Sequence, residues 1–167
     1  GDGFVSGEVT GITATGSVTY VSDGTVENTI TYTTGAAFRE ENYEITKIPG
    51  QLSITQSSNA IVITTASRSR EYNGQKLLDH QTTHTGTLAA GDQLVVEFPA
   101  DAGLTDVGTK RNEYKSYRVE RSDGADVTAN YTFGEPVIGT LTVTPVAIEL
   151  TANSAAKAYD GTPLTDS

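Results

Sequence analysis

Residues 60–64 read Ala-Ile-Val-Ile-Thr, and residues 147–151 read Ala-Ile-Glu-Leu-Thr. The two stretches begin 87 positions apart (147 − 60), and the same offset relates Glu-Tyr-Asn-Gly at 71–74 to Ala-Tyr-Asp-Gly at 158–161. Alternation of apolar residues is typical of a strand with one buried face, and Asn-Gly or Asp-Gly is typical of a tight turn. A strand and a turn that recur together at one offset indicate a repeated structural unit.

Two further landmarks recur at nearly the same spacing. One is Gly-Thr followed by Asn, at 24–28 and at 108–112, with an offset of 84 (108 − 24). The other is Asn-Tyr followed by a strand of the form Gly-x-Leu-x-(Ile/Val)-Thr. Its two copies comprise residues 42–43 with 50–55, and residues 130–131 with 139–144, at offsets of 88 (130 − 42) and 89 (139 − 50). Small drifts in offset are typical of loops that vary in length between fixed strands.

The order of these landmarks predicts the domain organisation. Only residues 57–144 contain all of them in sequence, so we expect one complete repeat there. Residues 1–56 carry the landmarks of the C-terminal part of a first repeat, and residues 145–167 carry those of the N-terminal strands of a third. We therefore expect tandem β-rich repeats arranged end to end, with joints at 57–59 and 144–145 that are too short to be flexible linkers.

The composition predicts an all-β fold with small sheets and little helix. Only 36% of the residues are hydrophobic, and β-branched residues are frequent, as in short half-buried strands. Alternation predicts strands that include Val18 with Tyr20 and Ile148 with Leu150. Residues 79–90 are the least strand-like, and we expect a short helix or an irregular crossover there.

Charge and cysteine content narrow the classes of partner. The chain carries 11 Lys and Arg against 21 Asp and Glu, a formal charge of −10, which opposes binding to nucleic acid. The most basic cluster is interleaved with Glu113 and Glu120; it comprises Lys110, Arg111, Lys115, Arg118 and Arg121. The chain has no Cys, which excludes disulfides and thiolate metal sites. The apolar runs are far shorter than the roughly 20 residues of a spanning helix, so we expect no membrane insertion in this segment.

The segment Lys-Ala-Tyr-Asp-Gly-Thr-Pro-Leu at 157–164 resembles the Tyr-Asp-Gly repeat of bacterial cell-surface adhesins, which belongs with the mostly-β-grasp (MBG) group. The closing strands that begin at Gly50 and Gly139 are also similar to that family. The central copy departs from the pattern, with Asn73 in place of Asp and Gln-Lys at 75–76 in place of Thr-Pro.

The resemblance implies small β-grasp-like sheets and an extracellular protein of the bacterial surface, attached to the cell wall or secreted. It implies a structural role for the motif, in which the tyrosine packs under the sheet edge and the following residues form the turn. The motif residues here are Tyr72, Asn73, Gly74, Tyr159, Asp160 and Gly161.

Candidate chemical groups are few. His80 and His84 are the only histidines and lack a third metal ligand in the pattern. Residues 123–126 (Asp-Gly-Ala-Asp) resemble half of a calcium loop, and Lys157 is a candidate for an isopeptide crosslink; both alternatives stay open. No nucleophile, nucleotide-binding or paired-carboxylate pattern assembles, with Glu40 and Glu41 adjacent in sequence, so we expect no enzymatic activity, cofactor or metal.

These observations predict a structural spacer, or stalk repeat, that displays distal binding domains of an adhesin. The alternative is a repeat that itself binds host glycan or extracellular-matrix protein through exposed aromatics such as Tyr114 and Tyr117. The expected partners are adjacent repeats of the same protein. Residues 145–167 are also expected to complete residues 1–56 of a neighbouring molecule by head-to-tail strand exchange.

Overall fold

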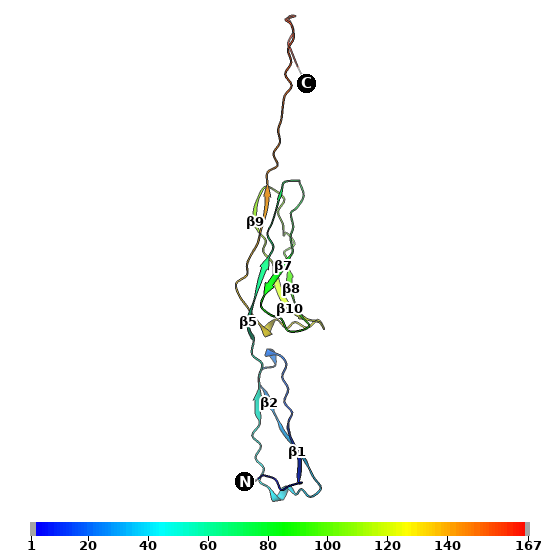
Figure 1. The fold of residues 1–167 in the computed structure, drawn as a ribbon, viewed down its shortest axis with the longest axis vertical. Helices are drawn as coiled ribbons and strands as arrows, with labels where there is room; N and C mark the ends of the chain where they lie inside the picture. The colour runs from blue at the N-terminus through cyan, green and yellow to red at the C-terminus, as the bar shows by residue number, and fades with distance from the viewer. Residues whose placement is uncertain (1–2, 166–167) are drawn as a thin grey trace.

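The computed structural model describes residues 3–165 and is elongated, with strands as its dominant element (Figure 1). Its strands, in chain order, are β1 (Val9–Ala14), β2 (Val26–Asn28), β3 (Ile30–Thr34), β4 (Gly50–Leu52), β5 (Ser57–Thr65), β6 (Arg68–Glu71), β7 (Thr82–Thr85), β8 (Asp92–Glu97), β9 (Gly108–Arg111), β10 (Ser116–Arg121), β11 (Tyr131–Phe133) and β12 (Thr140–Thr144). The helical elements in the described part of the chain are single 3₁₀ turns: η1 (Val21–Asp23), η2 (Glu40–Asn42) and η3 (Thr128–Asn130). The predicted all-β class with small sheets and little helix is confirmed.

The strands pair within two groups. β1 pairs antiparallel with β3, and β2 pairs antiparallel with β4, so residues 3–56 hold two two-stranded sheets and are called the head body below. Strands β5 to β12 pair among themselves within residues 57–144, called the central body. Residues 145–165, the C-terminal segment, contain no strand and run away from the central body at the end opposite the head body (Figure 1).

Two long stretches of the central body run parallel to each other. β5 pairs in parallel with β11, and β6 pairs in parallel with β12, with an isolated parallel bridge between Thr64 and Val137. Residues 57–71 and 131–144 therefore lie side by side along the body. β5 also pairs antiparallel with β7, β12 with β9, and β8 with β10.

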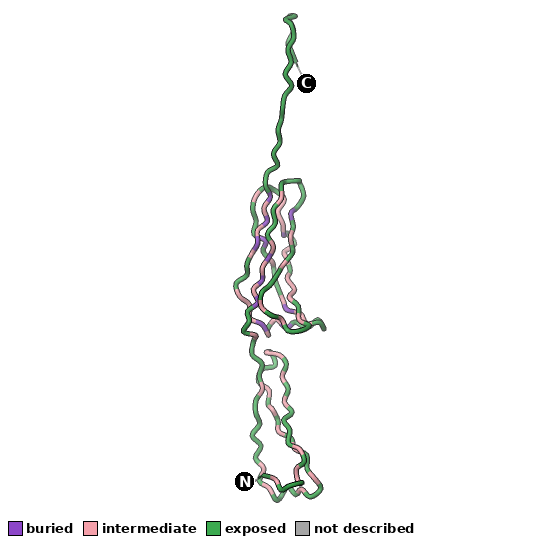
Figure 2. The backbone as a smooth tube through the Cα atoms, in the orientation of Figure 1, coloured by how far each residue is buried: buried purple, intermediate pink, exposed green. Residues whose placement is uncertain are grey.

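Within residues 3–165, the buried residues lie in the central body (Figure 2). One buried cluster comprises Ile61, Ile63, Val119, Val127 and Tyr131, and a second comprises Leu77, Leu141 and Val143. No described residue before Ile61 or after Val143 is buried. Isolated two-stranded sheets are marginal in water, so the head body has no core of its own to hold its strands.

Three local expectations are wrong. The expected joint at 57–59 is not one of them: it coincides with the first residues of β5, where the sheets of the head body give way to those of the central body. Residues 79–90, expected as a helix or irregular crossover, contain β7, which pairs with β5. The alternating residues at 18–20 and 148–150 form no strand, since neither stretch has a pairing partner in the described structure.

The two bodies should respond differently to loss of an isoleucine. Ile61→Ala removes a fully buried side chain and should lower the free energy of unfolding by about 2–5 kcal/mol. Ile12→Ala is the matched control, because Ile12 of β1 is 62% exposed and its loss should change stability by less than about 0.5 kcal/mol. Urea unfolding followed by circular dichroism measures both, and equal losses would contradict the placement of the core.

Candidate functional site at the junction of the two strand bodies

The head and central bodies meet through polar contacts rather than through a shared sheet. The backbone N–H of Val21 donates to Asn130 Oδ1 at 2.9 Å, and Gln56 Nε2 donates to the carbonyl of Ala129 at 3.0 Å. These contacts bring η1 of the head body against η3 of the central body. The two 3₁₀ turns thereby place the backbone N–H of Val21 and the side-chain amide of Asn130 within hydrogen-bonding distance of each other.

An arginine connects the core of the central body to the head. Arg121, the last residue of β10, donates from Nη1 to the hydroxyl of Tyr20 at 3.0 Å, and its guanidinium lies 5.1 Å from the centre of that ring. Tyr20 also packs against the buried cluster around Ile61. The junction therefore combines a hydrogen bond, a cation–π contact and apolar packing on one head-body side chain.

The carboxylate of Asp92 fixes the position of the Arg121 guanidinium. It accepts a hydrogen bond from Arg121 Nε at 3.0 Å and another from the Tyr131 hydroxyl at 2.7 Å, and the Asp92 side chain is only 1% exposed. The hydrogen bond from Arg121 lowers the pKa of Asp92 below its usual value, against the opposing effect of burial. Asp92 correspondingly raises the pKa of Arg121. Paired and hydrogen-bonded in this way, the buried carboxylate is ionised at neutral pH.

Beside this network lies a hollow of about 420 Å³. The head body lines it with Thr19 and Ile54, and the central body contributes Leu88, Asp92 and Tyr131. The charged and phenolic groups of its wall already pair with each other. The hollow is a feature of the joint, and its lining contains no His, Cys or Lys.

Tyr131 makes a second contact that fixes a turn. Its hydroxyl accepts the backbone N–H of Ala89 at 2.9 Å, while the N–H of Asp92 donates to the carbonyl of Ala89 at 3.0 Å. Gly91 inside this turn has a φ of 87°, which glycine adopts without strain. Burial raises the pKa of Tyr131, so its hydroxyl stays protonated and can donate to Asp92.

The head body contains the same arrangement around Tyr43. Its hydroxyl accepts the backbone N–H of Val5 at 3.0 Å and contacts the carboxylate of Glu8, and the N–H of Glu8 donates to the carbonyl of Val5 at 3.1 Å. Gly7 has a φ of 84°. The hydrogen bond to Glu8 raises the pKa of Tyr43. Each tyrosine also directly follows a 3₁₀ turn, η2 in the head body and η3 in the central body.

Strand registers agree between the bodies as well. In β2 and β4, Glu27 lies opposite Gln51; in β9 and β12, Arg111 lies opposite Thr140. The offsets of 84 (111 − 27) and 89 (140 − 51) are those that relate the sequence landmarks. The landmark pairs therefore occupy equivalent positions in two antiparallel ladders.

The Asn-Gly and Asp-Gly motifs form turns. Asn73 Oδ1 accepts the N–H of Gln75 at 3.1 Å, and Gly74 has a φ of 76°. Asp160 Oδ1 likewise accepts the N–H of Thr162 at 3.0 Å, and Gly161 has a φ of 77°. Carboxylate and amide side chains that bond the backbone two residues on are a common turn device.

The tyrosines of the two motifs differ in environment. Tyr72 donates its backbone N–H to the carbonyl of Thr144 at 2.8 Å and is 41% exposed. Tyr159 is 97% exposed, so the expectation that it packs under a sheet edge is wrong here. The reason is that the C-terminal segment has no sheet beside it in the described structure.

Tyr114 and Tyr117 lie together, in edge-to-face geometry with ring centres 5.9 Å apart. The Tyr117 ring also packs against the Phe133 ring, with ring centres 4.5 Å apart, and Tyr117 is 37% exposed. Tyr114 packs against the core, and burial raises its pKa. Of the two, Tyr117 offers the more accessible ring, and their role in ligand binding remains a prediction.

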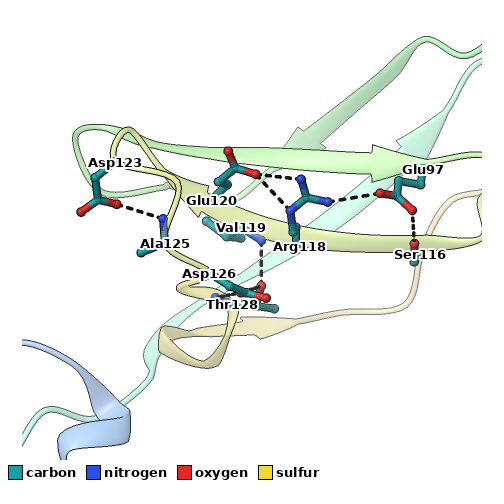
Figure 3. Close-up of polar contacts among 9 residues, drawn as sticks. All are labelled: Glu97, Ser116, Arg118, Val119, Glu120, Asp123, Ala125, Asp126 and Thr128. Atoms are coloured by element: carbon teal, nitrogen blue, oxygen red, sulfur yellow. Dashed lines mark hydrogen bonds and ion pairs between the residues drawn. The ribbon is translucent and has the colours of Figure 1, made fainter.

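A row of ion pairs lies on the antiparallel β8–β10 strand pair (Figure 3). Arg118 Nη2 contacts Glu120 at 2.8 Å, and its Nη1 contacts Glu97 at 3.2 Å. These partners are partly exposed, so the row contributes little to stability. Arg118, part of the basic cluster in the sequence, is thereby committed to neighbouring carboxylates.

The carboxylates at 123–126 serve their own loop (Figure 3). Asp123 Oδ1 accepts the N–H of Ala125 at 3.0 Å, and Asp126 Oδ1 accepts both the hydroxyl of Thr128 at 2.6 Å and its N–H at 2.9 Å. The Thr128 hydroxyl bond lowers the pKa of Asp126. The same hydroxyl accepts the N–H of Val119, which ties the loop to β10.

The remaining candidate groups lie apart. His80 stacks on Phe98 with ring centres 4.5 Å apart, whereas His84 lies in β7 with its Nδ1 3.2 Å from the carbonyl of Thr85. Glu40 and Glu41 lie in η2. Across residues 3–165, no group of three or more His, Cys, Asp or Glu is placed to hold a metal ion. The same residues contain no helix of the length and apolarity needed to cross a membrane.

Lys157, the isopeptide candidate, forms a local ion pair. Its Nζ lies 2.9 Å from Asp160 Oδ1 and donates to the carbonyl of Pro163 at 3.2 Å. Arg70 of the central body similarly donates to the carbonyl of Gln75 across the Asn-Gly turn. A cation that spans the turn is the shared feature of both motifs.

Comparisons with protein-family models, with curated proteins and with solved structures found no match. The junction residues Asp92, Arg121 and Tyr20 were missed in the sequence because they belong to no catalytic or metal pattern. A signal was nevertheless present: Gly7-Glu8 and Gly91-Asp92 lie at the offset of 84 (92 − 8) that relates other landmarks. An acidic residue that recurs at the repeat offset indicates a repeated structural contact.

The two tyrosine hydroxyls provide a matched pair of deletions. Tyr131→Phe should lower the free energy of unfolding by about 1–2 kcal/mol, because the buried Asp92 and the turn at Ala89 both lose a partner. Tyr43→Phe makes the same chemical change outside the core and should alter the main unfolding transition by less than about 0.5 kcal/mol. Chemical unfolding tests both, and a larger loss of stability for Tyr43→Phe than for Tyr131→Phe would contradict a stabilising role of the Tyr131 hydroxyl in the core.

The lowered pKa of Asp92 predicts acid sensitivity. Its stabilisation is complete above the ordinary aspartate pKa of about 3.9 and is lost as pH falls through the lower pKa of the folded state. The stability of the original chain should therefore fall more steeply between about pH 5 and pH 2 than that of Asp92→Asn. Unfolding curves across that range measure the difference, and parallel pH profiles would show that the Asp92–Arg121 pair contributes nothing.

Proposed function

We propose that this chain is a structural spacer segment of a bacterial surface adhesin, whose repeated β units hold distal binding domains away from the cell. The observation that carries the proposal is the junction of the two bodies along the long axis of the molecule (Figure 1). Tyr20 with Arg121, and Val21 with Asn130, link the bodies by direct contacts, without an intervening flexible linker. A joint of this kind keeps consecutive bodies at a fixed relative position along a stalk.

The repeat interpretation has independent geometric support. Tyr43 and Tyr131 make equivalent contacts to an acidic residue and to a backbone N–H, and the β2–β4 and β9–β12 ladders share a register. Two units with one internal plan favour a protein built by serial addition of modules. The resemblance to Tyr-Asp-Gly repeats of the MBG group favours the same class and a location outside the bacterial cell.

The chemistry of the junction favours a structural role over catalysis. Asp92, Arg121 and Tyr131 neutralise or hydrogen-bond one another at the wall of the hollow. A general acid or base must instead reach a proton on a substrate. We therefore propose that the chain acts without enzymatic activity or cofactor, and that its partners are adjacent repeats of the same protein.

A second candidate function is direct binding of host glycan or extracellular-matrix protein. The accessible ring of Tyr117, set beside Tyr114 and Phe133, favours it, because exposed aromatics often anchor ligands. The remainder of this aromatic row is turned into the core cluster. A ligand would thus meet mainly one ring, which favours the spacer as the first proposal.

A rigid joint can be measured by distances between spin labels. The chain has no Cys, so Thr33→Cys in the head body and Thr109→Cys in the central body introduce two exposed labelling sites. We expect one narrow distance distribution, and a broader one when Arg121→Ala removes the link to Tyr20. Arg111→Ala is the matched control, because Arg111 pairs with Glu113 in the exposed part of the central body.

Two outcomes would count against the spacer. A broad distribution in the original chain would mean that the bodies move independently and that the stalk is not stiff here. Saturable binding to a glycan array or to matrix proteins, abolished by Tyr117→Ala with folding retained, would replace the spacer with the adhesive function.

A further inference from the structure

The C-terminal segment presents apolar side chains that nothing in the described structure covers. Ile148 is 76% exposed and Leu150 is 91% exposed, in an extended chain that leaves the central body (Figure 2). The offset of 87 places them at the positions of Ile61 and Ile63 of β5, which are 0% and 2% exposed. The same pattern of residues is thus buried in β5 and exposed to solvent in the C-terminal segment.

The head body has the complementary deficiency. Residues 43–55 correspond to residues 131–144, which in the central body lie in parallel beside residues 57–71. In the described head body only 50–52 of this stretch form a strand, paired with β2 on one edge. Among the described residues, the edge that β12 uses for β6 has no partner on β4, and the stretch equivalent to β11 is not a strand.

A hollow of about 360 Å³ lies on the head body beside residues 43–46. Its lining includes Phe4, Tyr43 and Ile45. At the established offsets these residues correspond to Leu88, Tyr131 and Phe133, the side chains that surround Ile61 in the central body. The Phe4 ring already lies 5.1 Å from that of Tyr43, and Phe38 stacks on Tyr43 at 5.7 Å. Phe4, Tyr43 and Ile45 thus give the hollow an apolar and aromatic part, beside the polar residues Glu44 and Thr46.

A pair of glycines gives an independent indication. A Cβ on Gly139 would lie 2.2 Å from the carbonyl oxygen of Ala66, because the chain between β5 and β6 crosses directly over it. Its counterpart, Gly50, meets only Asn28 Cβ, at 3.8 Å, so a side chain would fit there in the isolated head body. Glycine at 50 has a steric reason only when a segment equivalent to residue 66 crosses it. The offset of 87 makes that equivalent Asn153 of the C-terminal segment.

We propose that residues 146–158 of one molecule add in parallel to residues 43–55 of a second copy and complete its head body. The central body fixes the register: Ile148 opposite Ile45, Thr151 opposite Ile48, Ala155 opposite Leu52 and Ala158 opposite Thr55. Ile148 and Leu150 then enter the aromatic hollow, and Asn153 crosses Gly50. Main-chain hydrogen bonds supply affinity, and the two apolar side chains fix the register.

A second copy is the occupant because residues 146–158 carry the residue pattern of β5 at the offset of 87 and lie too far from the head body of their own molecule to pair with it. The head body and the C-terminal segment are at opposite ends of the elongated molecule, separated by the whole central body (Figure 1). The contact is head-to-tail, with a different surface on each molecule, so it does not close on a pair and leads to linear chains. This inference depends on the shared register of the two bodies, and it stands whether or not the assembled protein serves as a stalk.

The test is the state of association of the full 167-residue chain in buffered salt that screens its net charge of −10. Sedimentation velocity from micromolar to millimolar concentration should show dimers and longer species that grow with concentration. Ile148→Asp and Leu150→Asp should each weaken association by at least about tenfold, because each puts a charge into the hollow. Neither change touches the core of the monomer, since both side chains are exposed in it.

The matched control in the same segment is Val146→Asp. Val146 is 44% exposed and corresponds to the exposed Asn59 of β5, so its side chain should remain in solvent and association should change by less than about twofold. On the acceptor side, Gly50→Ala should leave the unfolding of the monomer unchanged and weaken association by at least about tenfold. Gly139→Ala, by contrast, should destabilise the central body itself, because its Cβ has no space.

A strict monomer at every concentration would overturn the proposal, as would equal effects of Val146→Asp and Ile148→Asp, which would indicate unspecific apolar contact. Undiminished association of Gly50→Ala would exclude the proposed register. These results are separable from the spacer: a monomer that keeps a narrow spin-label distance across the junction would retain the stiff joint and lose only the assembly.

Discussion

Strand β5 is the interaction on which the rest of the structure depends. It pairs on one edge with β7 and on the other with β11, and its Ile61 and Ile63 belong to the larger of the two buried clusters. Apolar area removed from water is the main favourable contribution to folding. In the central body this area is buried because β5, from the start of the body, packs against residues near its end, such as Tyr131.

The head body shows what the same plan is like without that strand. Its tyrosine contact, its 3₁₀ turn and its β2–β4 ladder are formed, since these use only neighbouring parts of the chain. Its aromatic side chains, however, gather around a hollow, and no described residue there is buried. In the described head body, hydrogen bonds and turns are therefore formed without a buried core, whereas in the central body β5 contributes to one.

Much of this organisation could be predicted from the sequence, because repeat offsets report on strands and turns that must recur together. The Asn-Gly and Asp-Gly turns and the Gly50 and Gly139 strands follow from local chemistry. The failures are also physical. Residues 18–20 and 148–150 alternate in hydrophobicity as strands do, but they have no pairing partner in the described structure. Strand β7 is polar, so its sequence does not indicate a strand; it is one because it pairs with β5.

The junction was hidden for a related reason. Arg121 appears in the sequence as one member of a mixed-charge cluster, and nothing local distinguishes it from Arg118. Its role depends on two residues that are distant in sequence, Asp92 opposite it in the β8–β10 strand pair and Tyr20 in the other body. Contacts made across bodies are set by tertiary arrangement, and composition or periodicity does not contain them.

The parallel course of residues 57–71 and 131–144 has a mechanical consequence. A pull on the two ends of the central body loads β5 with β11, and β6 with β12, along their length, because the chain enters at one end and leaves at the other. In this shear geometry the ladder bonds share the load and must rupture together, whereas antiparallel neighbours pulled from one end unzip singly. Forced unfolding follows the unfolding rate, so this strand direction raises resistance to load without adding a single contact.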